Sequence, residues 1–188
     1  MRIFNRLTLM KTHATLAAFI LPVAIMFLTT GAFYSWGIKG SYTKATYELQ
    51  LQKPMQGELA ELVALATNEL IKQDIEPPTG GAKVKRIGDS FELEWTGSNR
   101  DIILEPTTQP LKAKLEVKDT SWYRQFVQLH KAKGGTPFKI YAAAFATAFL
   151  LLLITGFLIA WQTPKLRKLA LISASLGIVI FYLMVISS

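Results

Sequence analysis

The stretch 122–161 reads WYRQFVQLHKAKGGTPFKIYAAAFATAFLLLLITGFLIAW, and its order decides the fold. An amphipathic segment that carries His130 runs into a Gly-Gly break and then into a long apolar span. The start of the chain repeats this order, because His13 opens a second apolar span. Both spans end in the same motif, Thr-Gly-x-x-x-x-Trp, whose motif residues are Thr30, Gly31 and Trp36 in the first and Thr155, Gly156 and Trp161 in the second.

Three apolar blocks account for the unusual composition. The chain has 188 residues, of which 51% are hydrophobic, and its mean hydropathy is +0.28. The blocks 14–38, 140–164 and 169–188 contain no charged residue. About 20 mostly apolar residues cross a hydrocarbon layer of roughly 30 Å, and a spanning segment satisfies its backbone as a helix. We therefore predict three transmembrane helices. The first exceeds the roughly 7–15 apolar residues of a signal peptide, so we interpret it as an uncleaved anchor.

The basic residues indicate the orientation. Arg2, Arg6 and Lys11 precede the first span, and Lys165, Arg167 and Lys168 join the second span to the third, with no acid in either segment. Short basic segments stay in the cytoplasm, so the middle region and the C-terminus are predicted to lie outside it. The net charge of +8 therefore reflects topology rather than binding of nucleic acid. The predicted parts are a basic tail with the first helix (1–38), an extracytoplasmic domain (39–119), an amphipathic segment (120–135), the second helix (138–162), a basic loop (163–168) and the third helix (169–188).

The extracytoplasmic region predicts a small α+β domain inserted between the first and second transmembrane helices. Residues 56–71 place apolar side chains at three- and four-residue spacing, which is typical of a helix with one buried face. Phe91, Leu93 and Trp95 alternate with glutamates, as in a strand with one apolar face. The Gly97-Ser98-Asn99 turn predicts a hairpin into the strand at 100–104, and residues 111–117 alternate in the same way.

The segment before the Gly-Gly break has an apolar face. Trp122, Phe126 and Leu129 recur at helical spacing, and Arg124, Lys131 and Lys133 supply positive charge. Such a helix lies in the headgroup plane of a membrane, or it packs against the sheet of its own domain. The sequence leaves both alternatives open.

Most enzyme classes are not supported. The chain has no cysteine, no intramembrane acid or base, and no HExxH, GxSxG or phosphate-loop motif. We therefore predict no catalytic residue and no protein-chelated metal site.

The order of these segments resembles the PepSY-associated transmembrane proteins of bacteria. The resemblance rests on the LH…GG segment that leads to TGFLIAW, and on a PepSY-like domain with FELEW, RDIILEP and LKAKLEV. It implies a location in the bacterial inner membrane with a periplasmic domain and a periplasmic C-terminus. Larger members include siderophore-iron reductases that bind b-type haem through histidines near helix ends, and PepSY domains elsewhere regulate envelope proteins without catalysis.

The two histidines stand where the resemblance implies haem ligands. Because the first two spans run antiparallel, Thr30-Gly31 is expected near His130 and Thr155-Gly156 near His13. The two histidines are then separated by about the membrane thickness, roughly 30 Å, so they cannot share one iron. A haem with two histidine ligands needs a homodimer or a partner. The glycines make room either for the flat macrocycle or for a neighbouring helix.

Two hypotheses of different classes follow. The favoured one is a non-enzymatic accessory protein with no cofactor. It contacts the lipid bilayer and binds another membrane or periplasmic protein through Phe91, Trp95, Trp122 and Phe126. The alternative is a b-type haem electron carrier ligated by His13 and His130 across a homodimer or partner interface. Under this alternative hypothesis, if the protein is an enzyme, it is a haem-dependent membrane oxidoreductase that resembles ferric reductases.

Overall fold

The computed structural model describes residues 5–88 and 90–188, so Arg2 of the predicted basic tail lies outside the described residues. The chain divides into two compact units, which are described separately. One unit holds the residues up to Ala24 together with Ala143–Ser188. The other comprises Ile25–Ala142, and the helices α1 and α4 each contribute to both units.

Within residues 5–88 and 90–188, three helices are long and apolar enough to cross a membrane, as the composition predicts. They are α1 (Arg6–Ser35), α4 (Thr136–Gln162) and α5 (Pro164–Ile186). Helix α1 remains helical through Pro22. Neither α4 nor α5 has a fully buried residue, which is expected of helices whose side chains face lipid.

The boundary before the third helix differs from the prediction. The segment 163–168 was expected to be a loop, but α5 begins at Pro164, and only Thr163 separates it from α4. Proline favours the first position of a helix, because its fixed φ suits the helix and its missing N–H is not needed there. Lys165, Arg167 and Lys168 therefore lie in the first turns of α5.

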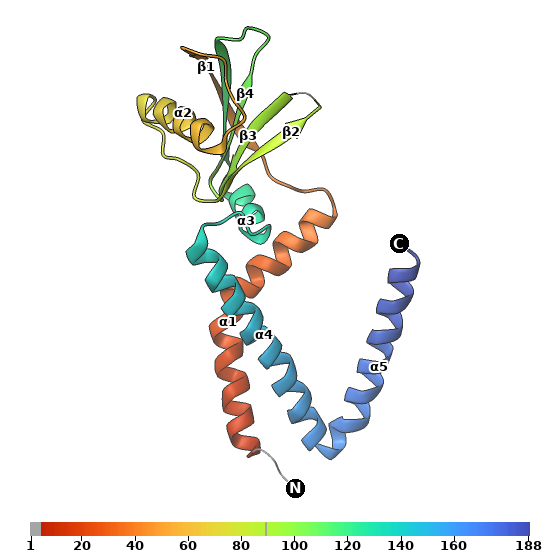
Figure 1. Ribbon diagram of the computed structural model, residues 1–188. Helices are drawn as coiled ribbons and strands as arrows, with labels where there is room; N and C mark the ends of the chain where they lie inside the picture. The colour runs from red at the N-terminus through yellow and green to blue at the C-terminus, as the bar shows by residue number, and fades with distance from the viewer. Residues whose placement is uncertain (1–4, 89) are drawn as a thin grey trace. The chain divides into compact units, whose positions relative to one another are not determined.

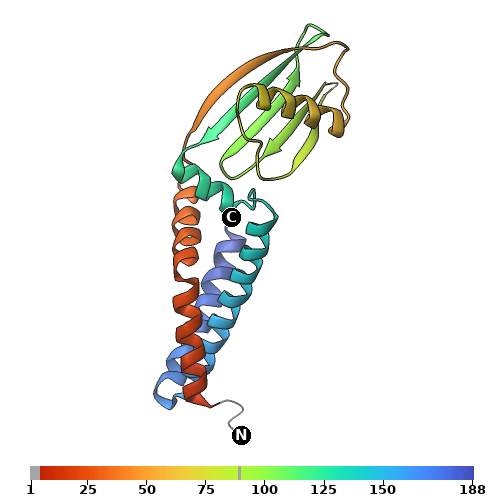
Figure 2. The same cartoon turned by 90° about the vertical axis from the view of Figure 1, so that its left-hand side faces the viewer.

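A five-stranded antiparallel sheet forms the centre of the second unit (Figure 1). The strand order is β1-β5-β4-β3-β2. Helix α2 (Leu59–Lys72) covers one face of the sheet, as Figure 2 shows. We call residues 42–120 the sheet domain. Its strands are β1 (Tyr42–Gln50), β2 (Ala82–Ile87), β3 (Ser90–Thr96), β4 (Arg100–Pro106) and β5 (Lys112–Thr120).

The core lies between α2 and the sheet, and it follows the predicted periodicities. Helix α2 buries Leu62, Ala66 and Leu70 at four-residue spacing. The strands contribute alternate residues, as a pleated sheet with one covered face requires. The predicted turn at 97–99 joins β3 to β4, whereas β2 was not singled out by the sequence. The buried strand residues of this core are Leu49, Leu93, Ile102, Leu104, Ala113, Leu115 and Val117.

Helix α3 (Trp122–His130) has one covered face and one exposed face. The hydroxyl of Ser121 caps its start by accepting a hydrogen bond from the backbone N–H of Arg124 at 3.3 Å. Val127 and Gln128 are buried, whereas Trp122 is 75% exposed and Phe126 is 41% exposed. The helix therefore packs within its own unit through one face, and its aromatic face remains open.

The chain has two Gly-Gly breaks in this unit, Gly80-Gly81 and Gly134-Gly135, and they lie against each other. A Cβ atom at Gly80 would stand 2.8 Å from the carbonyl oxygen of Lys133 and would collide with the carbonyl oxygen of Thr96. A Cβ atom at Gly135 would stand 3.0 Å from the carbonyl oxygen of Thr79. The close approach of these backbones explains why glycine occupies both breaks, and it fixes the start of α4 beside the sheet domain.

We expect Gly80→Ala to destabilise the protein by about 1–3 kcal/mol, because a backbone carbonyl must move to admit the methyl group. Gly81→Ala is the matched control, since a Cβ atom there meets nothing within 4 Å. Thermal unfolding of the full chain in detergent measures the difference. Equal unfolding temperatures for the two variants would contradict the close packing of the breaks.

Candidate functional site

His130 lies against the first Thr-Gly pair. Its ring nitrogen Nδ1 is 2.7 Å from the hydroxyl oxygen of the buried Thr30. The ring also rests on Gly31, where a Cβ atom would stand 3.2 Å from the imidazole Cε1. Phe27 packs beside it, with ring centroids 4.9 Å apart. A side chain at position 31 would require the imidazole to shift by a few tenths of an ångström, so glycine allows the closest approach of the ring.

The hydrogen bonds of Thr30 determine which nitrogen of His130 carries the proton. The Thr30 hydroxyl donates to the carbonyl oxygen of Met26 at 2.6 Å. A hydroxyl has one proton to donate, so toward His130 its oxygen accepts. Nδ1 of His130 is then the protonated nitrogen, and in the neutral ring Nε2 keeps its lone pair. The arrangement therefore presents Nε2 as a free ligand atom.

His13 repeats this geometry in the other unit. Its Nδ1 is 3.1 Å from the hydroxyl oxygen of Thr155, which donates to the carbonyl oxygen of Leu151 at 2.8 Å. A Cβ atom at Gly156 would stand 3.2 Å from Cε1 of His13. Each histidine thus meets the Thr-Gly pair of the other span, as an antiparallel pairing predicts. In both cases the glycine makes room for an imidazole, a role that the sequence did not suggest.

The tryptophans of the repeated motif lie outside these contacts. Trp36 follows α1 and is 86% exposed. Trp161 lies in α4, where the guanidinium of Arg167 stands 5.5 Å from its ring centroid and donates to its carbonyl oxygen at 3.0 Å. Aromatic rings at the ends of spans are typical of the membrane–water boundary, which explains their place in both motifs.

A cavity of about 330 Å³ opens beside His130. Its walls are mostly apolar, and they come from the end of α1 and from α3. The lining residues are Thr30, Gly31, Tyr34, Ser35, Val127, His130 and Lys131. An apolar space next to a nitrogen lone pair suits a hydrophobic ligand that carries a metal ion.

The donor set of each site is a single imidazole. Within residues 5–88 and 90–188 no three His, Cys, Asp or Glu side chains gather into a group that could hold a metal ion. A metal held by protein ligands alone is therefore not supported there. Haem iron needs only one or two axial ligands from the protein, and histidine is the commonest of them. The two sites fit that requirement through Nε2.

The predicted partner-binding residues fall into two groups. Leu93 between Phe91 and Trp95 is fully buried, and both aromatic rings pack against the core. The indole N–H of Trp95 donates to the carbonyl oxygen of Gly80 at 3.1 Å. This sheet face is therefore covered by α2 and its loops. The exposed members of the predicted surface are Trp122 and Phe126 on α3.

A buried carboxylate holds α3 to the sheet. Asp101 at the start of β4 is only 7% exposed. Its Oδ2 accepts from the Tyr42 hydroxyl at 2.8 Å, from the Gln128 amide at 2.7 Å and from Lys133 Nζ at 3.3 Å. Its Oδ1 accepts from the backbone N–H of Gly97 at 3.2 Å. Helix α3 covers this end of the strand, and no periodicity within β4 reveals that cover.

Tyr42 joins this network to Arg124. Its hydroxyl accepts from Arg124 at 2.8 Å and from the Gln128 amide at 3.2 Å, while it donates to Asp101. Burial raises the pKa of the Tyr42 hydroxyl above its ordinary value, and the neighbouring Asp101 carboxylate adds to the increase, against the opposing effect of Arg124. The hydroxyl therefore stays protonated as a donor to Asp101 at neutral pH.

Comparison with known families matches residues 2–163 to the family described as the PepSY-associated TM region. The match includes both histidines and both Thr-Gly pairs. No curated protein and no solved structure matches the chain significantly.

Proposed function

Because the chain belongs to the PepSY-associated transmembrane family, we propose that this membrane protein carries electrons through b-type haem ligated by His13 and His130. The observation that supports the proposal is the repeated histidine geometry. Nδ1 of each ring lies within hydrogen-bond distance of a threonine hydroxyl that itself donates within its own helix, and no described residue forms a hydrogen bond with Nε2. A histidine that ligates a metal is commonly held in this way by a partner of its other nitrogen.

The chain supplies one imidazole to each site. When bound, haem exchanges single electrons by changing the oxidation state of its iron. Thr30 and Thr155 hold the rings in one tautomer, and Gly31 and Gly156 let the rings lie close to the opposite helix. The second axial ligand of a site would come from a second copy of the chain or from another subunit. A homodimer would pair each histidine with its equivalent.

Orientation is part of the same proposal. Arg6 and Lys11 lie in the first turns of α1, and Lys165, Arg167 and Lys168 lie in the first turns of α5, so both segments belong on the cytoplasmic side of the inner membrane. The sheet domain and the C-terminus then lie in the periplasm. In this orientation the His13 site faces the cytoplasm and the His130 site faces the periplasm, which suits electron transfer across the membrane.

A reduced-minus-oxidised absorption spectrum tests the proposal. The protein is expressed with ample haem precursor and purified in detergent as the full chain. We expect the bands of a six-coordinate b-type haem, with about one haem per chain if every haem is shared by two copies. Protein that is folded and colourless under these conditions would refute the electron-carrier function.

The accessory function remains a prediction, and the surface that would bind a partner protein is smaller than the sequence suggested. Phe91 and Trp95 pack against the core, so a partner protein would meet mainly Trp122 and Phe126. A colourless protein that retains a co-purifying subunit, and loses it when these two residues become alanine, would favour this function over haem binding.

A further inference from the structure

Helix α3 is fastened along the C-terminal end of α1. The hydroxyl of Tyr123 donates to the carbonyl oxygen of Ile38 at 3.4 Å, and Arg124 donates to the carbonyl oxygen of Lys39 at 3.0 Å. The backbone is equally close, because a Cβ atom at Gly40 would stand 2.9 Å from Arg124. Since α1 is a candidate membrane span that ends at Ser35, α3 lies at the depth where the hydrocarbon layer ends.

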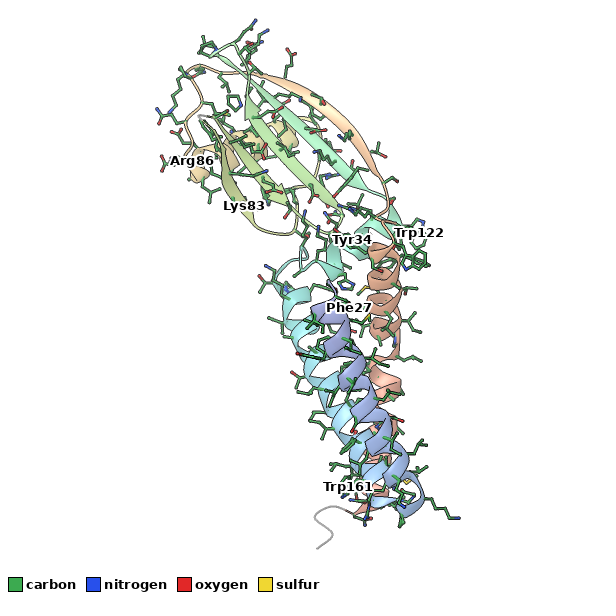
Figure 3. The ribbon with its side chains drawn as sticks, turned by 90° about the vertical axis from the view of Figure 1, so that its right-hand side faces the viewer. Phe27, Tyr34, Lys83, Arg86, Trp122 and Trp161 are labelled. Carbon is green, nitrogen blue, oxygen red and sulfur yellow. The ribbon has the colours of Figure 1, made fainter. Side chains whose placement is uncertain are left out.

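The open face of α3 is aromatic. Trp122 and Phe126 form an edge-to-face pair with centroids 6.2 Å apart, and both rings are exposed. Trp36, just beyond α1, is exposed as well. Figure 3 shows Trp122 projecting outward at the junction of α3 and α1. Tryptophan is enriched at membrane–water boundaries because its ring is apolar and its N–H is polar.

Positive charge without an acidic partner gathers at the Tyr34 ring near the end of α1. The amino groups of Lys39 and Lys131 stand 5.3 and 5.6 Å from the centroid of the Tyr34 ring. Neither lysine forms an ion pair with any described residue. The segments 33–47 and 120–139 contain no acid at all. The surface is therefore positively charged, and an anionic surface outside the chain would complement it.

We propose that these residues form an interface patch that docks on the headgroup layer and selects anionic phospholipids. The patch consists of Trp36, Lys39, Trp122, Phe126 and Lys131. The aromatic rings enter the boundary of the acyl chains, and the two lysines bind the phosphates of anionic headgroups. A lipid is the favoured occupant because the patch is continuous with the end of a membrane span. The proposal does not depend on haem.

Quenching of Trp122 fluorescence by brominated lipids tests the proposal. The full chain carries Trp36→Phe, Trp95→Phe and Trp161→Phe, so that only Trp122 emits, and is placed in bilayers of brominated phosphatidylcholine or brominated phosphatidylglycerol. A second variant that retains only Trp95 is the control, because this indole is bonded to Gly80 in the sheet domain. The quenching by the two lipids is compared for a single protein preparation. Any quenching by a bound chromophore is then the same in both lipids and cancels in the ratio.

We expect quenching of Trp122 in both lipids, stronger in phosphatidylglycerol, and none of Trp95. Attraction to an anionic surface is on the order of fivefold for each basic residue, so Lys39→Gln with Lys131→Gln should remove most of the preference. Arg86→Gln with Lys112→Gln removes the same charge from the sheet domain and should preserve it. Figure 3 shows Arg86 on the β2 side of the sheet, far from Trp122.

Two results would overturn the inference. Equal quenching in the two lipids would show that the patch does not select anionic headgroups. The absence of quenching in both would show that the patch faces away from the bilayer, and a protein partner would then be the occupant to seek.

Discussion

His13→Ala and His130→Ala are each expected to remove one population of bound haem, and the double variant is expected to bind none. Each site has one imidazole per chain, so no other described histidine can replace the lost ligand. Haem content per chain and the reduced-minus-oxidised spectrum measure the effect. Unchanged haem in both single variants would show that the His13 ring serves only to pack α1 against α4, and the His130 ring only to pack α3 against α1.

Loss of haem through misfolding is separated from loss of the ligand by adding imidazole. The small molecule should restore colour to the alanine variants, because it supplies the missing nitrogen but no helix contact. A variant that has lost its fold would stay colourless at any imidazole concentration.

A second prediction concerns Thr30 and Thr155, whose hydroxyl groups contact Nδ1 of the two histidines. Replacing a partner of a ligating histidine typically costs about 10–100-fold in affinity, so Thr30→Val and Thr155→Val should weaken haem binding by that order. Thr29 and Thr147 are matched controls. Each donates to a carbonyl four residues earlier in the same helix as its counterpart, and neither contacts a histidine. Equal affinities in test and control variants would contradict the role of Nδ1.

Most of the fold can be predicted from the sequence, because it depends on the thickness of a bilayer, the spacing of apolar residues in a helix and their alternation in a strand. The thickness of a bilayer sets the length of an apolar helix, so α1, α4 and α5 follow from composition. Four-residue spacing locates α2, and alternation locates β3 and β5. The predicted start of the third helix at residue 169 was wrong. The basic residues in 163–168 suggested a cytoplasmic loop, whereas Pro164 begins α5 almost directly after α4.

The candidate site is less accessible to sequence reasoning, because its contacts join distant segments. The reciprocal pairing of each histidine with the opposite Thr-Gly motif follows from antiparallel spans. The direction of the Thr30–His130 hydrogen bond does not, since it depends on where the Thr30 proton goes. The burial of Asp101 is equally hidden. Its neighbours in β4 alternate normally, and only the tertiary packing of α3 covers it.

Asp101→Ala should destabilise the protein by about 3–5 kcal/mol, because it leaves the partly buried Lys133 without its counter-charge and three further donors without an acceptor. For a chain of this size, such a loss lowers the unfolding temperature by on the order of 10 °C. Asp119→Ala is the matched control. Its carboxylate is half exposed and pairs with Arg100, so its removal should cost at most about 1 kcal/mol.

The same substitution should affect one histidine and spare the other. Gln128 is held by Asp101 and lies two residues before His130 in α3, so loss of the carboxylate loosens the helix that positions this ring. Below the unfolding temperature, Asp101→Ala should therefore weaken or broaden the haem signal that depends on His130. The signal that depends on His13 should remain, because His13 contacts Thr155 in the other compact unit. An equal change in both signals would show that Asp101 supports overall stability without positioning His130.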